Sequence, residues 1–139
     1  MLLSERVGLA CRENGTPFGE ESMFSFYSLS KPFCAIGAMK LWDRGLLDLE
    51  AHPSRYLPEA AALDGRVTVR QLLYHTSGLP DFEQDTDIPY RGDAAICGQL
   101  AALAEYPMQF APGEGAKYAN INFILSALII ERISGCSYE

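Results

Sequence analysis

The sequence contains few of the residues that build metal centres. It has two histidines, His52 and His75, and four cysteines that stand far apart, with no Cys-x-x-Cys pair. A structural zinc ion is held by about four such ligands at close spacing, so we expect no metal site. Because nothing in the cysteine spacing resembles a disulfide framework, we also expect all four thiols to be unpaired.

Stripes of basic residues are lacking as well. The 11 Lys and Arg residues are scattered, and the formal net charge is −7. A nucleic-acid surface needs clustered positive charge, so we expect no nucleic-acid partner. Apolar residues make up 48% of the 139 residues, which fits one globular domain with a modest core.

Long apolar runs and an export signal are missing too. The longest apolar segment, residues 121–133, is interrupted by four polar or charged side chains and is too short to cross a membrane. Residues 1–11 carry Glu5 and Arg6 where a signal peptide has its apolar run. Localisation therefore stays open.

Apolar spacing and turn residues predict a mostly helical chain. The first helix should begin at Ser28 as its N-cap, end near Gly45 and be largely buried, because apolar groups occupy most of its faces. The expected helices span residues 28–44, 68–74, 93–106 and 120–134.

Strand signals are weaker. Residues 6–12 fit one strand, followed by a turn at Asn14-Gly15. Residues 81–92 are acidic and irregular, which indicates an exposed loop. We expect its aspartates, Asp81, Asp85 and Asp87, to be solvated rather than to bind a metal.

Ser28-Leu29-Ser30-Lys31 is the only Ser-x-x-Lys sequence in the chain. Positions i and i+3 share a helix face, so Lys31 can reach the Ser28 hydroxyl and take its proton. Ser30 should point elsewhere on the helix. The tetrapeptide alone fits an N-cap serine beside a solvated lysine equally well.

Tyr118-Ala119-Asn120 lies after a Pro112-Gly113 turn and before a predicted helix. A tyrosine there can carry a proton to or from the serine, and an asparagine amide can accept from Lys31 and donate to a substrate carbonyl. Taken separately, Tyr118 also fits a half-buried aromatic and Asn120 an N-cap.

Together these segments resemble the penicillin-recognising serine hydrolases, the family of class C β-lactamases, D,D-peptidases and related esterases. The resemblance covers nearly the whole chain. It is carried by Phe24 to Lys31 with the helix up to Gly45, Leu47-Asp48-Leu49, Tyr56-Leu57-Pro58, residues 67–80 ending in His75-Thr76-Ser77-Gly78-Leu79-Pro80, Phe110-Ala111-Pro112-Gly113 and Tyr118-Ala119-Asn120.

The resemblance implies the α+β β-lactamase/transpeptidase-like fold, here mostly its helical part with at most one or two strands. It implies that Ser28 is acylated, that Lys31 and Tyr118 share proton transfer, and that Asn120 orients Lys31 and the substrate amide. Which of Lys31 and Tyr118 is the base stays open. His75 is expected to have a structural role in a turn. No cofactor is implied, and the substrate is a β-lactam, a D-Ala-D-Ala peptide or an ester.

The chain departs from the family in one respect. No Lys or His follows Lys117, so the family's Lys/His-x-Gly motif, which lies on a strand beside the site, does not occur after Asn120. We therefore expect residues 1–139 to form a partial domain, without the first strand and the C-terminal sheet, and to be inactive alone. The alternative is a catalytically inactive remnant, or a ligand-binding or interaction module.

Overall fold

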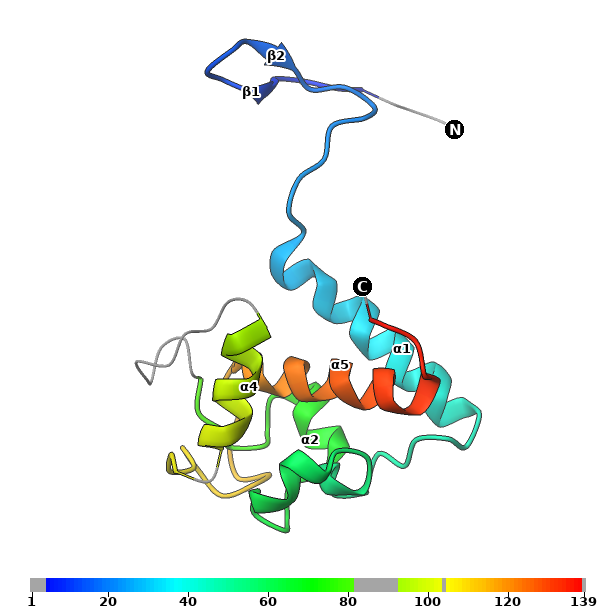
Figure 1. The fold of residues 1–139 in the computed structure, drawn as a ribbon, viewed down its shortest axis with the longest axis vertical. Coiled ribbons are helices and arrows are strands. Elements are labelled where there is room, and N and C mark those ends of the chain that lie inside the picture. Colours follow the sequence, from blue (N-terminus) through cyan, green and yellow to red (C-terminus); the bar gives the residue numbers. More distant parts are fainter. Residues whose placement is uncertain (1–4, 82–92, 104, 139) are drawn as a thin grey trace.

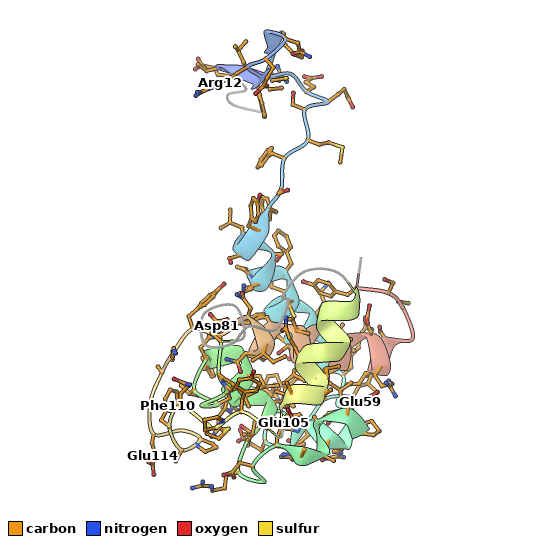
Figure 2. The ribbon with its side chains drawn as sticks, turned by 60° about the vertical axis from the view of Figure 1, so that its left-hand side comes forward. Arg12, Glu59, Asp81, Glu105, Phe110 and Glu114 are labelled. Carbon is orange, nitrogen blue, oxygen red and sulfur yellow. The ribbon has the colours of Figure 1, made fainter. Side chains whose placement is uncertain are left out.

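A computed structural model describes residues 5–81, 93–103 and 105–138, in which a group of helices is joined to a small hairpin by an extended segment (Figure 1). Strand β1 (Leu9–Cys11) pairs antiparallel with β2 (Thr16–Pro17) across the predicted turn. The strand expected over residues 6–12 is thus shorter than predicted. Figure 2 shows Arg12 in this hairpin, away from the helical body that holds Glu59 and Asp81.

The first long helix begins later than the sequence suggested. A 3₁₀ turn, η1 (Tyr27–Ser30), leads into α1 (Lys31–Asp43), and the N-cap of α1 is Ser30. The prediction that Ser28 is the N-cap is therefore wrong. The reason is local: Tyr27 has a positive φ of 47°, and the Leu29 N–H donates to the carbonyl of Phe26 at 3.1 Å, so this turn has the tighter i to i+3 pattern.

Helix α1 packs on α5 (Asn120–Ser134) through one face only. Cys34, Ala38 and Leu41, at helical spacing, are buried on that face. Gly37 is the point of close approach, because a Cβ there would lie 3.3 Å from Cδ1 of Ile130. The small residue lets the two helices lie close together.

The other face of α1 is open. Phe33, Ile36 and Trp42 are 61%, 56% and 46% exposed. The prediction of a largely buried helix is therefore wrong. Apolar composition indicates that a face can be buried, but burial also needs a neighbouring element, and α5 covers one side only.

Helix α2 (Val69–Tyr74) confirms the predicted helix over residues 68–74. Thr68 and Gln71 form a capping box, in which each side chain accepts from the other residue's main-chain N–H. The helix ends at His75, which has a left-handed φ of 57°. α2 packs against α5, which brings His75 to the start of that helix.

Helices α5 and α4 (Asp93–Ala102) complete the body. α5 has the predicted bounds and ends at Gly135. α4 starts as predicted but ends before residue 106, because the Glu105 N–H bonds the carbonyl of Ala102 in an i to i+3 turn at 2.9 Å. α4 packs against the 3₁₀ turn η3 (Pro58–Ala62), which follows η2 (Pro53–Arg55).

The core lies between α1, α2 and α5 and the loop residues beneath them. Its largest fully buried apolar side chains are Leu72, Leu79, Ile121, Leu125 and Ile129. Across residues 5–81, 93–103 and 105–138, no helix combines the length and apolar character needed to span a membrane.

Residues 77–81 are buried, so the exposed loop predicted over residues 81–92 is wrong at Asp81, and residues 82–92 lie outside the described residues. Gly78 has a φ of 80°, and a Cβ on it would lie 2.1 Å from the carbonyl oxygen of Phe110. Asp81 is fully buried. The Gly78 turn packs against the loop that carries Phe110, and the Gln109 N–H donates to the Gly78 carbonyl at 2.8 Å, so tertiary contacts bury a residue whose acidic neighbours in sequence suggested exposure. Asp85 and Asp87 lie outside the described residues.

Candidate active site

Four side chains predicted from two distant segments meet at one point. The Ser28 Oγ lies 2.7 Å from the phenol oxygen of Tyr118, and the Lys31 Nζ donates to the same Oγ at 3.2 Å. Both distances are within hydrogen-bond range. The serine hydroxyl therefore has two groups beside it that can exchange its proton.

Asn120 links these two groups. Its Oδ1 accepts from Lys31 Nζ at 3.0 Å and from the Tyr118 hydroxyl at 3.1 Å. One amide oxygen thus fixes the positions of the lysine and the tyrosine relative to each other. The predicted contact between Asn120 and Lys31 is confirmed, whereas the N-cap of α5 is Ala119.

Local structure explains how each side chain reaches the site. Ser28 and Lys31 are three residues apart on the continuous turn formed by η1 and α1, so they share a face. Tyr118 lies in extended chain before α5, and Asn120 is the first residue of that helix. Ser30, between the first two, turns its Oγ to the carbonyl of Tyr27 at 2.7 Å, as predicted.

Aromatic rings form the wall beside Lys31. Its Nζ lies 4.8 Å from the ring centroid of Tyr118 and 5.8 Å from that of Phe123. A cation at these distances is attracted to the ring faces. Phe123 is a site neighbour that the sequence analysis missed, and only its position one turn into α5 could have indicated it.

His75 lies directly behind Tyr118. The two ring centroids are 4.7 Å apart with planes inclined by 30°, and the ring of Phe123 lies 5.2 Å away on α5. The Nδ1 of His75 faces the main-chain N–H of Ala119 at 3.3 Å and the Nδ2 of Asn122 at 3.2 Å. The His75 carbonyl accepts from the Lys117 N–H at 3.0 Å.

The pKa of His75 is below its ordinary value of 6.5. Partial burial disfavours the charged ring, the Lys31 ammonium group repels it, and the carboxylate of Asp81 acts in the opposite sense. The neutral ring is therefore the favoured form near neutral pH.

A buried polar network continues behind His75. Ser77 donates through its Oγ to Oδ1 of Asn122 at 2.6 Å and accepts from the Leu79 N–H at 3.2 Å. Both Ser77 and Asn122 are fully buried. Asn122 was not among the predicted site residues, although a polar residue inside an apolar helix was a usable signal.

Cys11, Cys34 and Cys136 are free, as predicted, and the side chain of Cys97 is not described. Among the described residues, no three His, Cys, Asp or Glu side chains gather as metal ligands.

The sequence matches the family model described as Beta-lactamase over residues 2–139. It is 37% identical over 145 residues to penicillin-binding protein 4* of Bacillus subtilis (strain 168), covering 99% of this chain and 31% of that protein. Esterase EstB of Burkholderia gladioli is 35% identical over 151 residues, covering 97% and 38%. The chain thus spans about a third of the length of these curated relatives.

A solved class C β-lactamase superposes on this chain with a TM-score of 0.78 and 31% identity, covering 96% of this chain and 36% of the other. The fold class predicted from the sequence is therefore confirmed. In the described residues, the fold is represented by helices and one two-stranded sheet.

Proposed function

The chain belongs to the β-lactamase family of serine hydrolases, and from this premise we propose that Ser28 is its acylated nucleophile. The observation that carries the proposal is the position of the Ser28 hydroxyl between Lys31 Nζ and the Tyr118 phenol, at 3.2 and 2.7 Å. A serine hydroxyl becomes a useful nucleophile only when a neighbouring base takes its proton.

The first half-reaction forms an acyl-enzyme. Ser28 Oγ loses its proton to neutral Lys31 or to the Tyr118 phenolate and attacks the substrate carbonyl carbon. The tetrahedral intermediate then collapses, the bond to the leaving nitrogen or oxygen breaks, and the same group returns the proton to the leaving atom. In the second half-reaction, water repeats these steps and releases the acid.

Asn120 fixes the positions of Lys31 and Tyr118 relative to each other. Its Oδ1 accepts from both Lys31 and Tyr118, so a proton leaving Ser28 arrives in a network whose geometry is already fixed. Neutral Lys31 can accept the Ser28 proton while it still donates to Asn120, whereas Tyr118 can act as base only as a phenolate, which no longer donates to Asn120 Oδ1. The assignment of the base in each half-reaction stays open.

The proposed substrate has a carbonyl group that can acylate a serine, in a β-lactam, a peptide ending in D-Ala-D-Ala or an ester. The matched relatives include a penicillin-binding protein and an esterase. All three substrates pass through the same acyl-serine, and the pocket walls decide among them. By resemblance to the family, the Lys/His-x-Gly strand supplies one oxyanion donor, and this sequence lacks that motif.

Intact-mass analysis of the folded chain tests the proposal. The chain is incubated separately with a penicillin and with a fluorophosphonate, alongside Ser28→Ala and the matched control Ser30→Ala. A single adduct that is lost in Ser28→Ala and kept in Ser30→Ala, whose hydroxyl faces the Tyr27 carbonyl, would support the proposal, because Ser28 would then be activated although residues 1–139 contain no Lys/His-x-Gly sequence. An adduct that persists in Ser28→Ala would refute the assignment.

A second candidate is a catalytically inactive remnant, or a ligand-binding or interaction module. A cooperative thermal transition without any adduct would support it. A non-cooperative melt would rule out a module that folds by itself.

A further inference from the structure

We infer that His75 is a positioning residue for Tyr118, because its neutral imidazole holds the main chain and the ring of the tyrosine from one side. The inference rests on the proposed function of Ser28 and Tyr118. It adds a residue outside that set, one that touches neither the Ser28 hydroxyl nor Lys31 by any hydrogen bond in the described structure.

The first observation is that His75 makes contacts on both sides of Tyr118 in sequence. Its carbonyl accepts from the Lys117 N–H at 3.0 Å, and its Nδ1 faces the Ala119 N–H at 3.3 Å. The segment carrying the tyrosine has no helix or strand geometry of its own. One residue therefore fixes the main chain before and after Tyr118.

The second observation is the packing of the rings. The imidazole contacts the rings of both Tyr118 and Phe123, with centroid separations of 4.7 and 5.2 Å. Tyr118 is 44% exposed, and Lys31 Nζ lies 4.8 Å from the centroid of the same ring. The imidazole therefore supports the phenol ring, while the hydroxyl reaches Ser28 at 2.7 Å.

The third observation concerns the tautomer. Two donors, the Ala119 N–H and the Asn122 amide, point at Nδ1. Oδ1 of Asn122 is fixed by the Ser77 hydroxyl, so its Nδ2 faces the ring. Nδ1 must then act as acceptor, and the ring proton lies on Nε2.

Protonation would remove this acceptor. An imidazolium ring carries a proton on both nitrogens, so Nδ1 would itself be a donor. It could then no longer accept from the Ala119 N–H or the Asn122 amide. The charged or titratable groups around the ring are Lys31 from α1, Tyr118 before α5 and Asp81 after α2. The left-handed backbone at His75, with φ of 57°, fixes the direction of its ring and carbonyl at the end of α2.

Fluorophosphonate labelling of the full chain in a double-mutant cycle tests the inference. His75→Asn suits the left-handed backbone but removes the ring, and His75→Phe keeps a ring but removes the acceptor. We expect each to slow labelling of Ser28 by about 10- to 100-fold in protein that still melts cooperatively. In a Tyr118→Phe background, neither should slow labelling further, because the hydroxyl that His75 positions is already absent.

Labelling at the parent rate, or an equal loss in both backgrounds, would overturn the inference, since a general structural role would act whether or not the hydroxyl is present. A second readout does not depend on acylation. By ¹⁵N NMR, His75 should be the Nε2–H tautomer, and the Ala119 amide should exchange faster with solvent as His75 is protonated. The chain has two histidines, and the ¹⁵N signals that disappear in His75→Asn are those of His75.

If the parent chain takes no label, the proposed function of this chain fails, and the NMR result alone decides the inference. An Nδ1–H tautomer, or an Ala119 amide whose protection is unchanged when His75 is protonated, would then overturn it. An Nε2–H tautomer with coupled release of the amide would support it.

Discussion

The phenol oxygen of Tyr118 lies 2.7 Å from Oγ of Ser28, although the two residues are 90 positions apart in the chain. Nothing local brings them together. The contact depends on the packing of α1 and α2 against α5, and on the short segment that precedes α5. The reactivity of the serine is therefore sensitive to the tertiary fold.

Removing one oxygen atom tests the role of the tyrosine. Tyr118→Phe should slow acylation of Ser28 by about 10²- to 10⁴-fold, because a proton carrier is lost while the ring still packs on His75. The rate is measured by mass spectrometry of samples quenched at successive times after addition of an activated ester or a fluorophosphonate. Tyr74→Phe, at an exposed position, is the matched control. Equal rates for all three proteins would contradict the proposed role.

Stability should depend on pH through His75. Its folded pKa is below the ordinary value of 6.5, so the unfolded chain takes up this proton first as the pH falls. The contribution of the neutral ring to the free energy of unfolding is therefore fully present above about pH 6.5 and is lost as the pH falls through the pKa of His75 in the folded chain. Melting temperatures from about pH 7.5 to 5 should fall less steeply in His75→Asn than in the parent chain.

His52→Asn controls for the removal of a histidine elsewhere, with a side chain that can still accept from the Ser54 N–H. If His75→Asn and the parent chain lost stability in parallel over this range, the pKa of His75 would not differ between the folded and unfolded states.

Cys34 should resist alkylation in the folded chain. Burial raises the pKa of its thiol to about 11, while Tyr138 and Lys31 act weakly in the opposite sense. The thiolate is the reactive form, so iodoacetamide should modify exposed Cys136 much faster. Peptide mass mapping over time distinguishes the two sites, and denatured protein provides the control in which all four cysteines react. Equal rates in folded protein would contradict the burial of Cys34.

Gly78→Ala should destabilise the fold by about 1–3 kcal/mol or more. The residue has a φ of 80°, and the added methyl group would overlap the Phe110 carbonyl, which cannot move without disturbing the loop before α5. Urea unfolding measures the loss. Gly65→Ala is the matched control, because a methyl group added there would have no atom within 4 Å and its φ is not positive. A loss equal to that of the control would contradict the close approach.

Features that depend on residues only a few positions apart could be predicted from the sequence. Ser28 and Lys31 share a face because they are three residues apart, and α2 begins where Thr68 and Gln71 form their capping box. Tyr118 and Asn120 could be linked to this pair only through the family resemblance, because no local rule relates residues 90 positions apart.

Features set by tertiary packing were harder to predict. The outer face of α1 is apolar but exposed, since composition does not reveal which neighbour is present. Asp81 is buried although it begins an acidic stretch. The contacts of His75 with Tyr118 and Phe123 depend on how α2 meets α5, which a sequence pattern does not specify.

Gly37 connects the distance between α1 and α5 with the geometry of the candidate active site. It lies six residues, or about 9 Å along the axis, beyond Lys31, at a place where α1 lies against Ile130 of α5. Lys31 and Asn120 stand at the starts of these same two helices. A larger residue at position 37 would press on Ile130 and should move Tyr118 and Asn120 away from Ser28 and Lys31. The proposed proton transfer at Ser28 should therefore respond to a substitution at Gly37, which is not one of the four predicted site residues.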